Sequence, residues 1–590
     1  MSDLTKIAKV IAVGPDSIEI EITSTKDYEG LPKKPQIGSY LQISDGDGTN
    51  SKLVAVIRGF RIKDSLGSED GKDVSEPRFI LSLQPVGHIF EDYFYRGGQA
   101  ITIPPKLVEL ASEDLLTRIY SGGDNHNKLS FGHLSQDNEI EVHLDGDLFF
   151  SKHIGVVGST GSGKSTAVAA ILQEGIKASA AQQKAGTLNN SHILVFDLHG
   201  EYKSAFPAAR VLGAQDFKLP YWLMNSEELE EMFVESNEYN SHNQISQFRN
   251  AVILNKISQN PKIPPEHISY DSPLYFSLDE VHNYLANLNS EVIGKEPKEN
   301  KPKLACGTLV TNREESYFKA KHTFVESTRS TGKKASNGPF HGEFERFLMR
   351  LSAKQNDSRL NFLLAPTDEK GEEFKSADLK TILELILGYG KEEDTNVTIL
   401  DLSGVPFEVL SIVVSLVCRL VFSFCFHFKK ELPENSTEVP FLLVLEEAHN
   451  YVSKAEGAKY NSVRKAVERI AKEGRKYGVS LMIVSQRPSE ISETIFSQCN
   501  NFVVMRLTNP TDQGYIKRLL PDNVGGLTDS LSTLEQREAL LLGDAFALPS
   551  IVKIKTITDL PRSADVKFMT EWRKDWQSIT FEEIIKRWMD

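Results

Sequence analysis

The sequence has little cysteine: Cys306, Cys418, Cys425 and Cys499 are the only ones in 590 residues. No two of them form a CxxC pair or a spacing typical of a zinc site, and they outline no disulfide framework. The first residues, MSDLTKIAKV, also lack the charged, apolar and small-residue order of a secretory signal. These features argue against a disulfide-stabilised secreted domain, and we expect a protein of the reducing cytoplasm.

Long apolar runs are also scarce. VLSIVVSLVCRLVFSFCFHF, residues 409–428, approaches the length of a membrane span. Arg419 lies at its centre, where a charge would be costly in a bilayer, and a strand-like VTIL at 397–400 precedes it. We therefore expect a buried helix of an α/β domain and no membrane partner.

Positive charge is in deficit, because 67 Lys and Arg stand against 81 Asp and Glu, giving a formal net charge of -14. This balance argues against a protein that coats nucleic acid without specificity, since phosphate binding draws on clustered cations. The deficit is uneven, because residues 295–340 hold ten Lys or Arg and five Glu. That stretch is either a solvated, partly disordered loop or an element that faces DNA.

The segments that are present indicate several structural regions. Residues 1–150 contain short alternating segments broken by Gly, Pro and Asp, which predict a small antiparallel β-barrel or sandwich. Apolar strands alternate with long helical stretches over 151–204 and again over 391–558, which predicts an α/β domain with a mostly parallel sheet covered by helices. Residues 205–390, between these two parts, have helical periodicity and form a predicted helical insertion.

The last region, residues 559–590, forms a predicted helical tail. It holds three of the four tryptophans, Trp572, Trp576 and Trp588, at spacings that can share one face of a helix. A terminal aromatic helix of this kind can dock on its own domain or clasp a neighbouring subunit.

The stretch GSTGSGKS, residues 158–165, matches the phosphate-loop pattern G-x-x-x-x-G-K-[ST]. It lies between a predicted strand (153–159) and a predicted helix (164 to about 180), the context that this motif requires. Lys164 is expected to reach the β- and γ-phosphates of ATP, and Ser165 to ligate Mg²⁺. The candidate nucleotide-binding residues are Gly158, Ser159, Thr160, Gly161, Ser162, Gly163, Lys164, Ser165 and Thr166.

A second candidate element is FLLVLEEAH, residues 441–449, in which two glutamates follow a buried strand. Glu446 is expected near the metal, and Glu447 is expected to orient or deprotonate the attacking water. The alternative is a pair of surface glutamates that open a helix, where acidic residues are favoured. The phosphate loop earlier in the chain favours the catalytic interpretation.

Two further residues are candidates at other strand and helix ends. Gln486 ends the predicted strand LMIVSQ (481–486) and could contact the γ-phosphate or the water, or could be a plain strand-end glutamine. Arg475, in KAVERIAKEGRKYGVS, could belong to a basic helix terminus. It could instead enter a neighbour's site, where an arginine stabilises transition-state charge.

The order of five further motifs after GSTGSGKST resembles the HerA ATPases of the HerA and FtsK superfamily. The motifs are FDLHGEY (196–202), LDLSGVP (400–406), LEEAHNYV (445–452), EGRKYG (473–478) and VSQRPSEI (484–491). REALLLGDAFALPSIVKI (537–554) is similar to that family's closing strands. The resemblance covers nearly the whole chain, and it departs from the usual pattern at Leu198 and Glu446.

The resemblance implies a RecA-like P-loop core with an N-terminal β-barrel, and a homohexameric ring that uses ATP to move double-stranded DNA. Within it, Glu447 is catalytic, Gln486 is a sensor and Arg475 completes a neighbour's site. Asp197, His199 and Glu201 belong to a motif beside the nucleotide, and the tail can act as a subunit latch. Implied partners are a NurA-like nuclease in DNA repair, or nuclease-domain and sirtuin-like effectors in antiphage defence. A nucleotide-gated scaffold that activates an effector with little DNA movement is the main alternative, and a secretion or conjugation ATPase is a weaker one.

Overall fold

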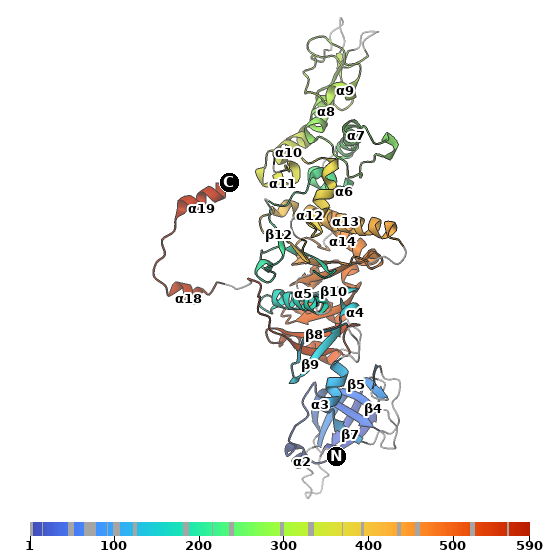
Figure 1. The fold of residues 1–590 in the computed structure, drawn as a ribbon, viewed down its shortest axis with the longest axis vertical. Helices are drawn as coiled ribbons and strands as arrows, with labels where there is room; N and C mark the ends of the chain where they lie inside the picture. Colours follow the sequence, from blue (N-terminus) through green and yellow to red (C-terminus); the bar gives the residue numbers. More distant parts are fainter. Residues whose placement is uncertain are drawn as a thin grey trace, which may run out of the picture.

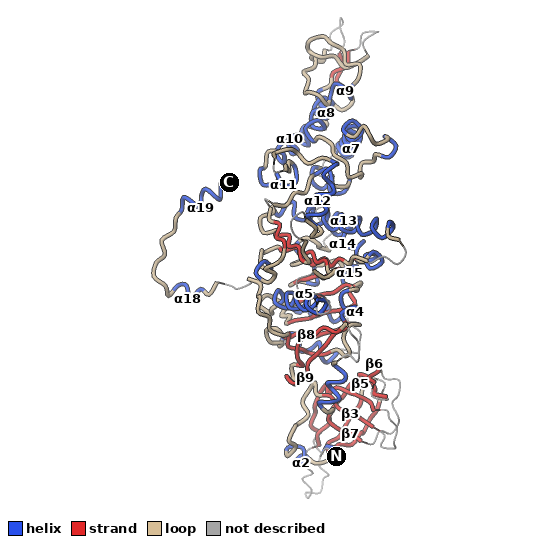
Figure 2. The backbone as a smooth tube through the Cα atoms, in the orientation of Figure 1, coloured by secondary structure: helices blue, strands red, loops and turns tan. Residues whose placement is uncertain are grey.

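The computed structural model describes most of the chain. The residues outside the description are 1–3, 15, 45–51, 64–77, 91–92, 98–106, 122–126, 181–187, 215, 235–240, 295–299, 329–334, 369, 391–393, 434–437, 455–460, 520–524, 563–565 and 590. The molecule is elongated, with an N-terminal β unit at one end, a large mixed sheet in the middle and helices at the other end (Figures 1 and 2).

The N-terminal unit is a seven-stranded antiparallel sheet with strand order β1-β2-β5-β4-β3-β7, in which β6 pairs with β5. It curves into a half-barrel around an apolar interior that includes Ile20, Leu41 and Leu83. Its helices are α1 (Leu4–Ile7), α2 (Thr25–Glu29) and α3 (Glu113–Tyr120). Its strands are β1 (Ala8–Val13), β2 (Ile18–Ile22), β3 (Tyr40–Ser44), β4 (Lys52–Lys63), β5 (Arg78–Phe90), β6 (Tyr93–Arg96) and β7 (Leu107–Leu110).

The large sheet has eleven strands in the order β12-β15-β11-β16-β17-β10-β18-β19-β20-β8-β9. Neighbours from β12 to β18 are parallel, and those from β18 to β9 are antiparallel. The strands are β8 (Lys128–Leu134), β9 (Asp137–Asp145), β10 (His153–Val157), β11 (His192–Asp197), β12 (Arg210–Leu212), β15 (Val397–Asp401), β16 (Phe441–Leu445), β17 (Val479–Ser485), β18 (Cys499–Met505), β19 (Glu538–Gly543) and β20 (Ser550–Ile554). This confirms the predicted P-loop α/β core.

Helices cover both faces of the parallel strands, which is why those strands are apolar at most positions. Along β16, Leu443 and Leu445 belong to the core under α13 and α14, whereas Leu442 and Val444 belong to the core under α5. The helices of this region are α4 (Gly146–Phe150), α5 (Lys164–Ala180), α13 (Phe407–Glu431), α14 (Asn461–Glu473), α15 (Glu493–Phe496), α16 (Pro510–Leu519) and α17 (Gly525–Thr528).

Strands β8 and β9 correct one predicted boundary. The sequence placed all of residues 1–150 in one N-terminal β domain, but β8 pairs with β20 and so belongs to the large sheet. The prediction is wrong here because alternating apolar residues indicate an antiparallel strand without specifying which sheet it joins. We keep the other boundaries as a proposed division: 151–204 with 391–558, 205–390, and 559–590.

The region between the two parts of the core is mostly helical and shares the core's hydrophobic interior. One continuous cluster includes Trp222 and Phe248 from this region and Val413 of α13. Its elements are α6 (Ser226–Phe233), α7 (Ser241–Gln259), α8 (Leu278–Ser290), β13 (Val292–Gly294), α9 (Arg313–Tyr317), β14 (Ala335–Asn337), α10 (Glu345–Gln355), α11 (Asn361–Leu364) and α12 (Leu379–Ile386). The insertion is therefore continuous with the core under α13.

Helix α13 contains the apolar run 409–428. It is long and apolar enough to cross a membrane by composition, yet 78% of its most apolar window is buried inside the protein. Arg419, at its centre, pairs with Glu228 of α6 at 2.8 Å. This burial matches the prediction of a core helix.

The C-terminal tail extends away from the body of the molecule (Figure 1). It contains α18 (Phe568–Trp572) and α19 (Phe581–Met589). Trp572, Trp576 and Trp588 are 72%, 97% and 87% exposed, so the described part of the tail that carries α18 and α19 does not dock on its own domain.

Candidate nucleotide site

The phosphate loop connects β10 to the first turn of α5, as the sequence predicts. Gly161 (φ 72°) and Gly163 (φ 99°) lie in the left-handed region, which glycine adopts without steric cost. The Ser159 amide donates to the Arg506 carbonyl at 2.7 Å, which ties the loop to the end of β18. The loop therefore presents the amino end of a long helix, where backbone amides and the helix dipole favour phosphate.

Lys164 is buried at the start of α5, and its Nζ lies 3.8 Å from Glu447 Oε1. Burial lowers the pKa of Lys164, and the nearby carboxylates Glu447, Glu446 and Glu201 partly offset this effect. Ser162 Oγ and Glu446 Oε2 are buried without a hydrogen-bond partner. Such atoms are unusual in a folded protein, and they suit a site completed by a ligand.

Glu447 follows β16 and has backbone φ 45°, ψ 44°, a left-handed conformation that is strained for a glutamate. Gln486 holds its carboxylate: Nε2 donates to Oε1, and the backbone amide donates to Oε2 at 3.3 Å. The other end of Gln486 contacts the phosphate loop, because Thr160 Oγ1 donates to Gln486 Oε1 at 2.5 Å. Gln486 thus joins the predicted catalytic carboxylate to the loop.

Glu446 faces the neighbouring strand β11. Burial, and then the negative charges of Asp197, Glu201 and Glu447, raise the pKa of Glu446 well above its ordinary value. Asp197 accepts hydrogen bonds from the backbone amides of Glu201 (3.1 Å) and Tyr202 (2.9 Å). Asp197 therefore holds the turn that follows β11 and brings Glu201 toward Ser165.

Burial also raises the pKa of Glu201, while a hydrogen bond with the Ser165 side chain and the charge of His199 lower it. His199 itself is exposed, at the edge of the cluster, and Thr166 is half-buried on the first turn of α5. The structure thus brings Ser165, Asp197, Glu201 and Glu446 into one group beside the phosphate loop.

The donor set fits Mg²⁺ bound together with a nucleotide. Among the described residues, no three His, Cys, Asp or Glu side chains are arranged to hold a metal alone. Mg²⁺ on nucleotides usually takes only one or two protein ligands, with phosphates and water supplying the rest. The unpartnered Glu446 Oε2 and the hydroxyl of Ser165 match that small requirement.

Arg475 lies at the opposite edge of the sheet. It belongs to the short helix η8 (Gly474–Tyr477), just before β17, whereas Glu447 and Gln486 follow the carboxyl ends of β16 and β17. Its Nη2 donates to the Gln498 carbonyl at 3.0 Å and to Asn500 Oδ1. It also lines a cavity of about 640 Å³ at this edge. Arg475 therefore takes no part in the nucleotide site of its own chain.

Two residues beside the phosphate loop, His449 and Arg537, are not among the site residues predicted from the sequence. His449 Nδ1 lies 3.3 Å from Glu447 Oε2 and 3.2 Å from Ser485 Oγ. The Arg537 backbone amide donates to the Ser162 carbonyl at 3.0 Å, and Arg537 adopts φ 67°. His449 could have been found from its place in LEEAH, whereas the position of Arg537 depends on β19 lying near the loop.

Comparison with known proteins gives consistent results. Residues 129–421 match the family described as the central domain of helicase HerA. The chain is 26% identical to the DNA double-strand break repair helicase HerA of Sulfolobus acidocaldarius, with 79% of this chain and 76% of the relative covered. It is 26% identical to the protein of the same name from Saccharolobus solfataricus, covering 81% and 78%. A probable helicase of Methanocaldococcus jannaschii is 24% identical over 92% of this chain and 90% of its own.

Solved structures also match over much of the chain. VirB4 of Thermoanaerobacter pseudethanolicus is 12% identical, with 74% of this chain and 98% of that chain covered and a TM-score of 0.45. The plasmid coupling protein TrwB, in complex with a non-hydrolysable ATP analogue, is 13% identical, with 76% and 94% covered and a TM-score of 0.42.

Replacing Glu447 with glutamine tests its predicted role. Glu447→Gln keeps the side-chain shape but removes the base, so ATP should still bind while turnover falls roughly 10²–10⁴-fold. Fluorescent-nucleotide binding and phosphate release would measure the two properties. Glu473→Gln, at an exposed carboxylate of α14, is the control. Retained turnover in Glu447→Gln would mean that another group activates the water.

The crowded carboxylates predict a pH effect on stability without nucleotide. Because the folded pKa of Glu446 is raised, its contribution to the free energy of unfolding is full below the ordinary glutamate pKa. It is lost as pH rises through the folded pKa. Glu446→Gln should therefore be more stable than the wild type at mildly alkaline pH, with a smaller decline from acidic pH. Thermal unfolding across pH would measure how stability changes with pH in the wild type and in Glu446→Gln. Equal pH dependence in the two proteins would contradict the prediction.

Proposed function

The chain belongs to the HerA family and is an ATP hydrolase, and on that basis we propose that it is a DNA motor. In this proposal, a homohexameric ring hydrolyses ATP to translocate or unwind double-stranded DNA. The observation that carries the proposal is the link from Thr160 through Gln486 to Glu447. Such a link lets the state of the phosphates act on the catalytic carboxylate. The names of the archaeal relatives support DNA as the substrate and break repair as the setting.

Each residue of the site has a distinct part in the proposed hydrolysis. The loop amides of 158–163 and the Lys164 ammonium bind the phosphates of ATP. Glu447 orients the attacking water and accepts its proton, while Gln486 senses the γ-phosphate. Ser165 and Glu446 would hold Mg²⁺, which neutralises phosphate charge when bound.

In the proposed ring, a neighbouring subunit supplies the arginine that the nucleotide site of one chain lacks. Arg475 is far from the site of its own chain but available to a neighbour, where it would stabilise the transferred charge. The exposed aromatic tail would latch adjacent subunits, and its base is tied to the nucleotide motif. The Arg562 amide donates to the Glu201 carbonyl at 2.9 Å, and Ser204 Oγ donates to the Leu560 carbonyl at 2.7 Å.

DNA contact is proposed for the basic stretch 295–340 of the insertion. Half of its cations, Lys295, Lys298, Arg329, Lys333 and Lys334, lie outside the described residues. Lys301 and Lys321 are exposed, Lys303 is half-buried, Arg313 is paired with Glu291, and Lys319 is paired with Glu315. Two described cations therefore remain the main support for this surface.

A separate effector completes the proposal. We place the protein in the cytoplasm, with a NurA-like, nuclease-domain or sirtuin-like partner in end processing or antiphage defence. The exposed side chains of Phe90, Tyr93 and Tyr95 on the half-barrel support a protein-docking surface. The same surface favours the second candidate, a nucleotide-gated ring that activates an effector with little DNA movement.

Linear double-stranded DNA should stimulate ATP turnover severalfold, because a motor couples hydrolysis to its track. The steady-state rate of the purified protein with and without DNA measures this, and Glu447→Gln provides the blank. A rate that is indifferent to DNA but raised by a co-purifying protein would reject the motor in favour of the gated ring.

Arg475→Ala should lower turnover, on the order of 10³-fold, if it acts as an arginine finger. Mixing it with Lys164→Ala subunits should restore activity, because some sites then combine an intact Lys164 with a neighbour's intact Arg475. The matched control is a mixture of Lys164→Ala with Glu447→Gln, which yields no complete site because both residues act within one chain. Absence of rescue in the first mixture would exclude a role across subunits.

A further inference from the structure

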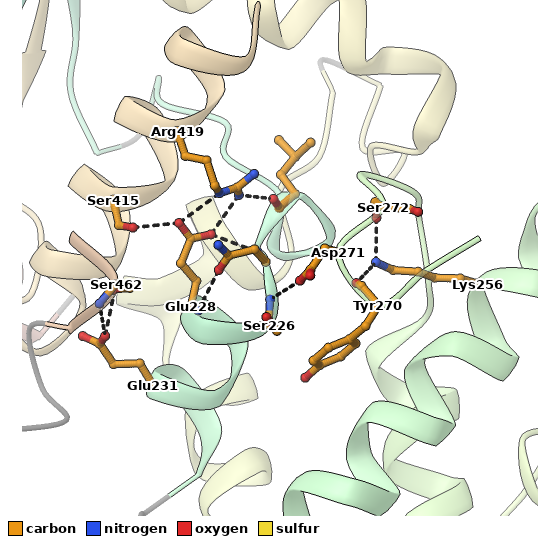
Figure 3. Close-up of polar contacts among 12 residues, drawn as sticks. Ser226, Glu228, Glu231, Lys256, Tyr270, Asp271, Ser272, Ser415, Arg419 and Ser462 are labelled. Atoms are coloured by element: carbon orange, nitrogen blue, oxygen red, sulfur yellow. Dashed lines mark hydrogen bonds and ion pairs between the residues drawn. The ribbon is translucent and has the colours of Figure 1, made fainter. Parts of the chain in front are cut away.

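Helix α6 is the first helix of the insertion, and it lies against the core helices α13 and α14 (Figure 3). Two of its carboxylates, Glu228 and Glu231, are nearly one helical turn apart and point toward the core. Glu228 attaches α6 to α13, whereas Glu231 contacts both α13, through Ser411, and the beginning of α14, through Ser462.

Glu228 anchors α6 to α13. Its fully buried carboxylate accepts Ser415 Oγ at 2.8 Å and Arg419 Nη2 at 2.8 Å, as well as the Asn225 amide at 2.9 Å. Arg419 also donates to the Leu223 carbonyl at 2.5 Å. A buried charge with this many donors is held in one place, and loss of a partner would be strongly destabilising. Glu228 is therefore a fixed anchor.

Glu231 connects the same helix to α14 by a smaller, half-buried contact. Its Oε2 accepts Ser462 Oγ at 2.8 Å and the Ser462 amide at 3.3 Å, while Oε1 accepts Ser411 Oγ at 3.1 Å. Ser462 lies in the first turn of α14, where a carboxylate also interacts favourably with the helix dipole. The insertion thus holds the amino end of α14.

The rest of α14 contacts the parts that surround the nucleotide site. Glu468 Oε1 accepts Ser492 Oγ at 2.7 Å, and Ser492 follows the segment that begins at Gln486. The Ala471 carbonyl lies 2.9 Å from Nε2 of His153, the first residue of the strand that leads to the phosphate loop. The helix ends immediately before η8, which carries Arg475.

We propose that Glu231 is a positioning residue through which the insertion sets the position of α14 and so regulates hydrolysis. A ligand that binds the insertion acts through Glu231 on α14. Under the proposed function, this ligand is double-stranded DNA. Helix α14 then acts on the Gln486 segment and on Arg475. The proposal rests on the proposed function for the identity of the ligand, but the contact between α6 and α14 does not.

A second contact between α6 and α14, an ion pair, offers a matched control. Glu227 Oε1 and Lys465 Nζ are 2.6 Å apart, but their side chains are 39% and 54% exposed. Exposed pairs contribute little because water screens them. Glu227→Ala therefore removes a carboxylate from α6 without removing the hydrogen bonds to the start of α14.

The first experiment compares ATP turnover with and without linear double-stranded DNA in Glu231→Ala, Glu231→Gln, Ser462→Ala and the Glu231→Ala/Ser462→Ala double variant. In Glu231→Ala, the ratio of turnover with DNA to turnover without DNA should be about fivefold or more below the wild-type ratio. Basal turnover and the midpoint of thermal unfolding should be unchanged. The double variant should lose no more than Glu231→Ala, because the two residues share one contact. Glu231→Gln should recover part of the stimulation, since its amide oxygen can still accept from Ser462.

Normal stimulation in both Glu231→Ala and Ser462→Ala would overturn the proposal, as would an equal loss in Glu227→Ala. If Glu231→Ala fails to fold, Ser462→Ala decides alone, because it removes only one hydroxyl.

A second measurement separates this proposal from the proposed function. Coupling is reciprocal, so ATP bound to the Glu447→Gln protein should change hydrogen exchange in α6, and adding Glu231→Ala should abolish that change. This readout needs no DNA. Wild-type turnover that DNA does not stimulate would reject the motor, whereas α6 exchange that ATP does not alter would reject the role of Glu231.

Discussion

The burial of one lysine among several carboxylates determines the electrostatics of the nucleotide site, at the carboxyl ends of the parallel strands. Lys164, Glu446 and Glu447 are all withdrawn from water, and a buried charge is costly unless it is paired. The 3.8 Å separation of Lys164 from Glu447 provides only a loose pair. Glu446 is left beside other negative groups, with a raised pKa and an unpartnered oxygen. Under the proposed function, nucleotide phosphates and a divalent cation would supply the charges that these groups lack.

The strained backbone at Glu447 is held by the contacts of its side chain. A left-handed glutamate persists only where its surroundings hold it, and here Gln486 and His449 contact its carboxylate. Both contacts come from residues near the ends of β16 and β17, adjacent parallel strands. The sheet therefore positions the proposed catalytic group, and Thr160 connects that group to the phosphate loop.

The insertion and the proposed ring are both connected to the nucleotide site, but through different contacts. The insertion shares the hydrophobic core under α13, so it is firmly joined to the ATPase unit. Its α6 contacts the helix that leads to Arg475, at the edge of the sheet remote from the chain's own phosphate loop. In the proposed ring, α14 would thus connect the insertion of one subunit to the nucleotide site of its neighbour.

Sequence alone determined the parts in which neighbouring residues suffice. The strand, phosphate loop and helix over 153–180, the glutamates after FLLVL and the burial of 409–428 all follow from local spacing and hydropathy. Tertiary structure decided which sheet β8 joins, the edge on which Arg475 lies, and the contacts of His449 and Arg537. It also decided contacts between distant residues, such as Thr160 with Gln486, 326 positions apart, and Glu231 with Ser462, 231 apart. These depend on strand order and helix packing, which bring distant segments together in ways that no local pattern encodes.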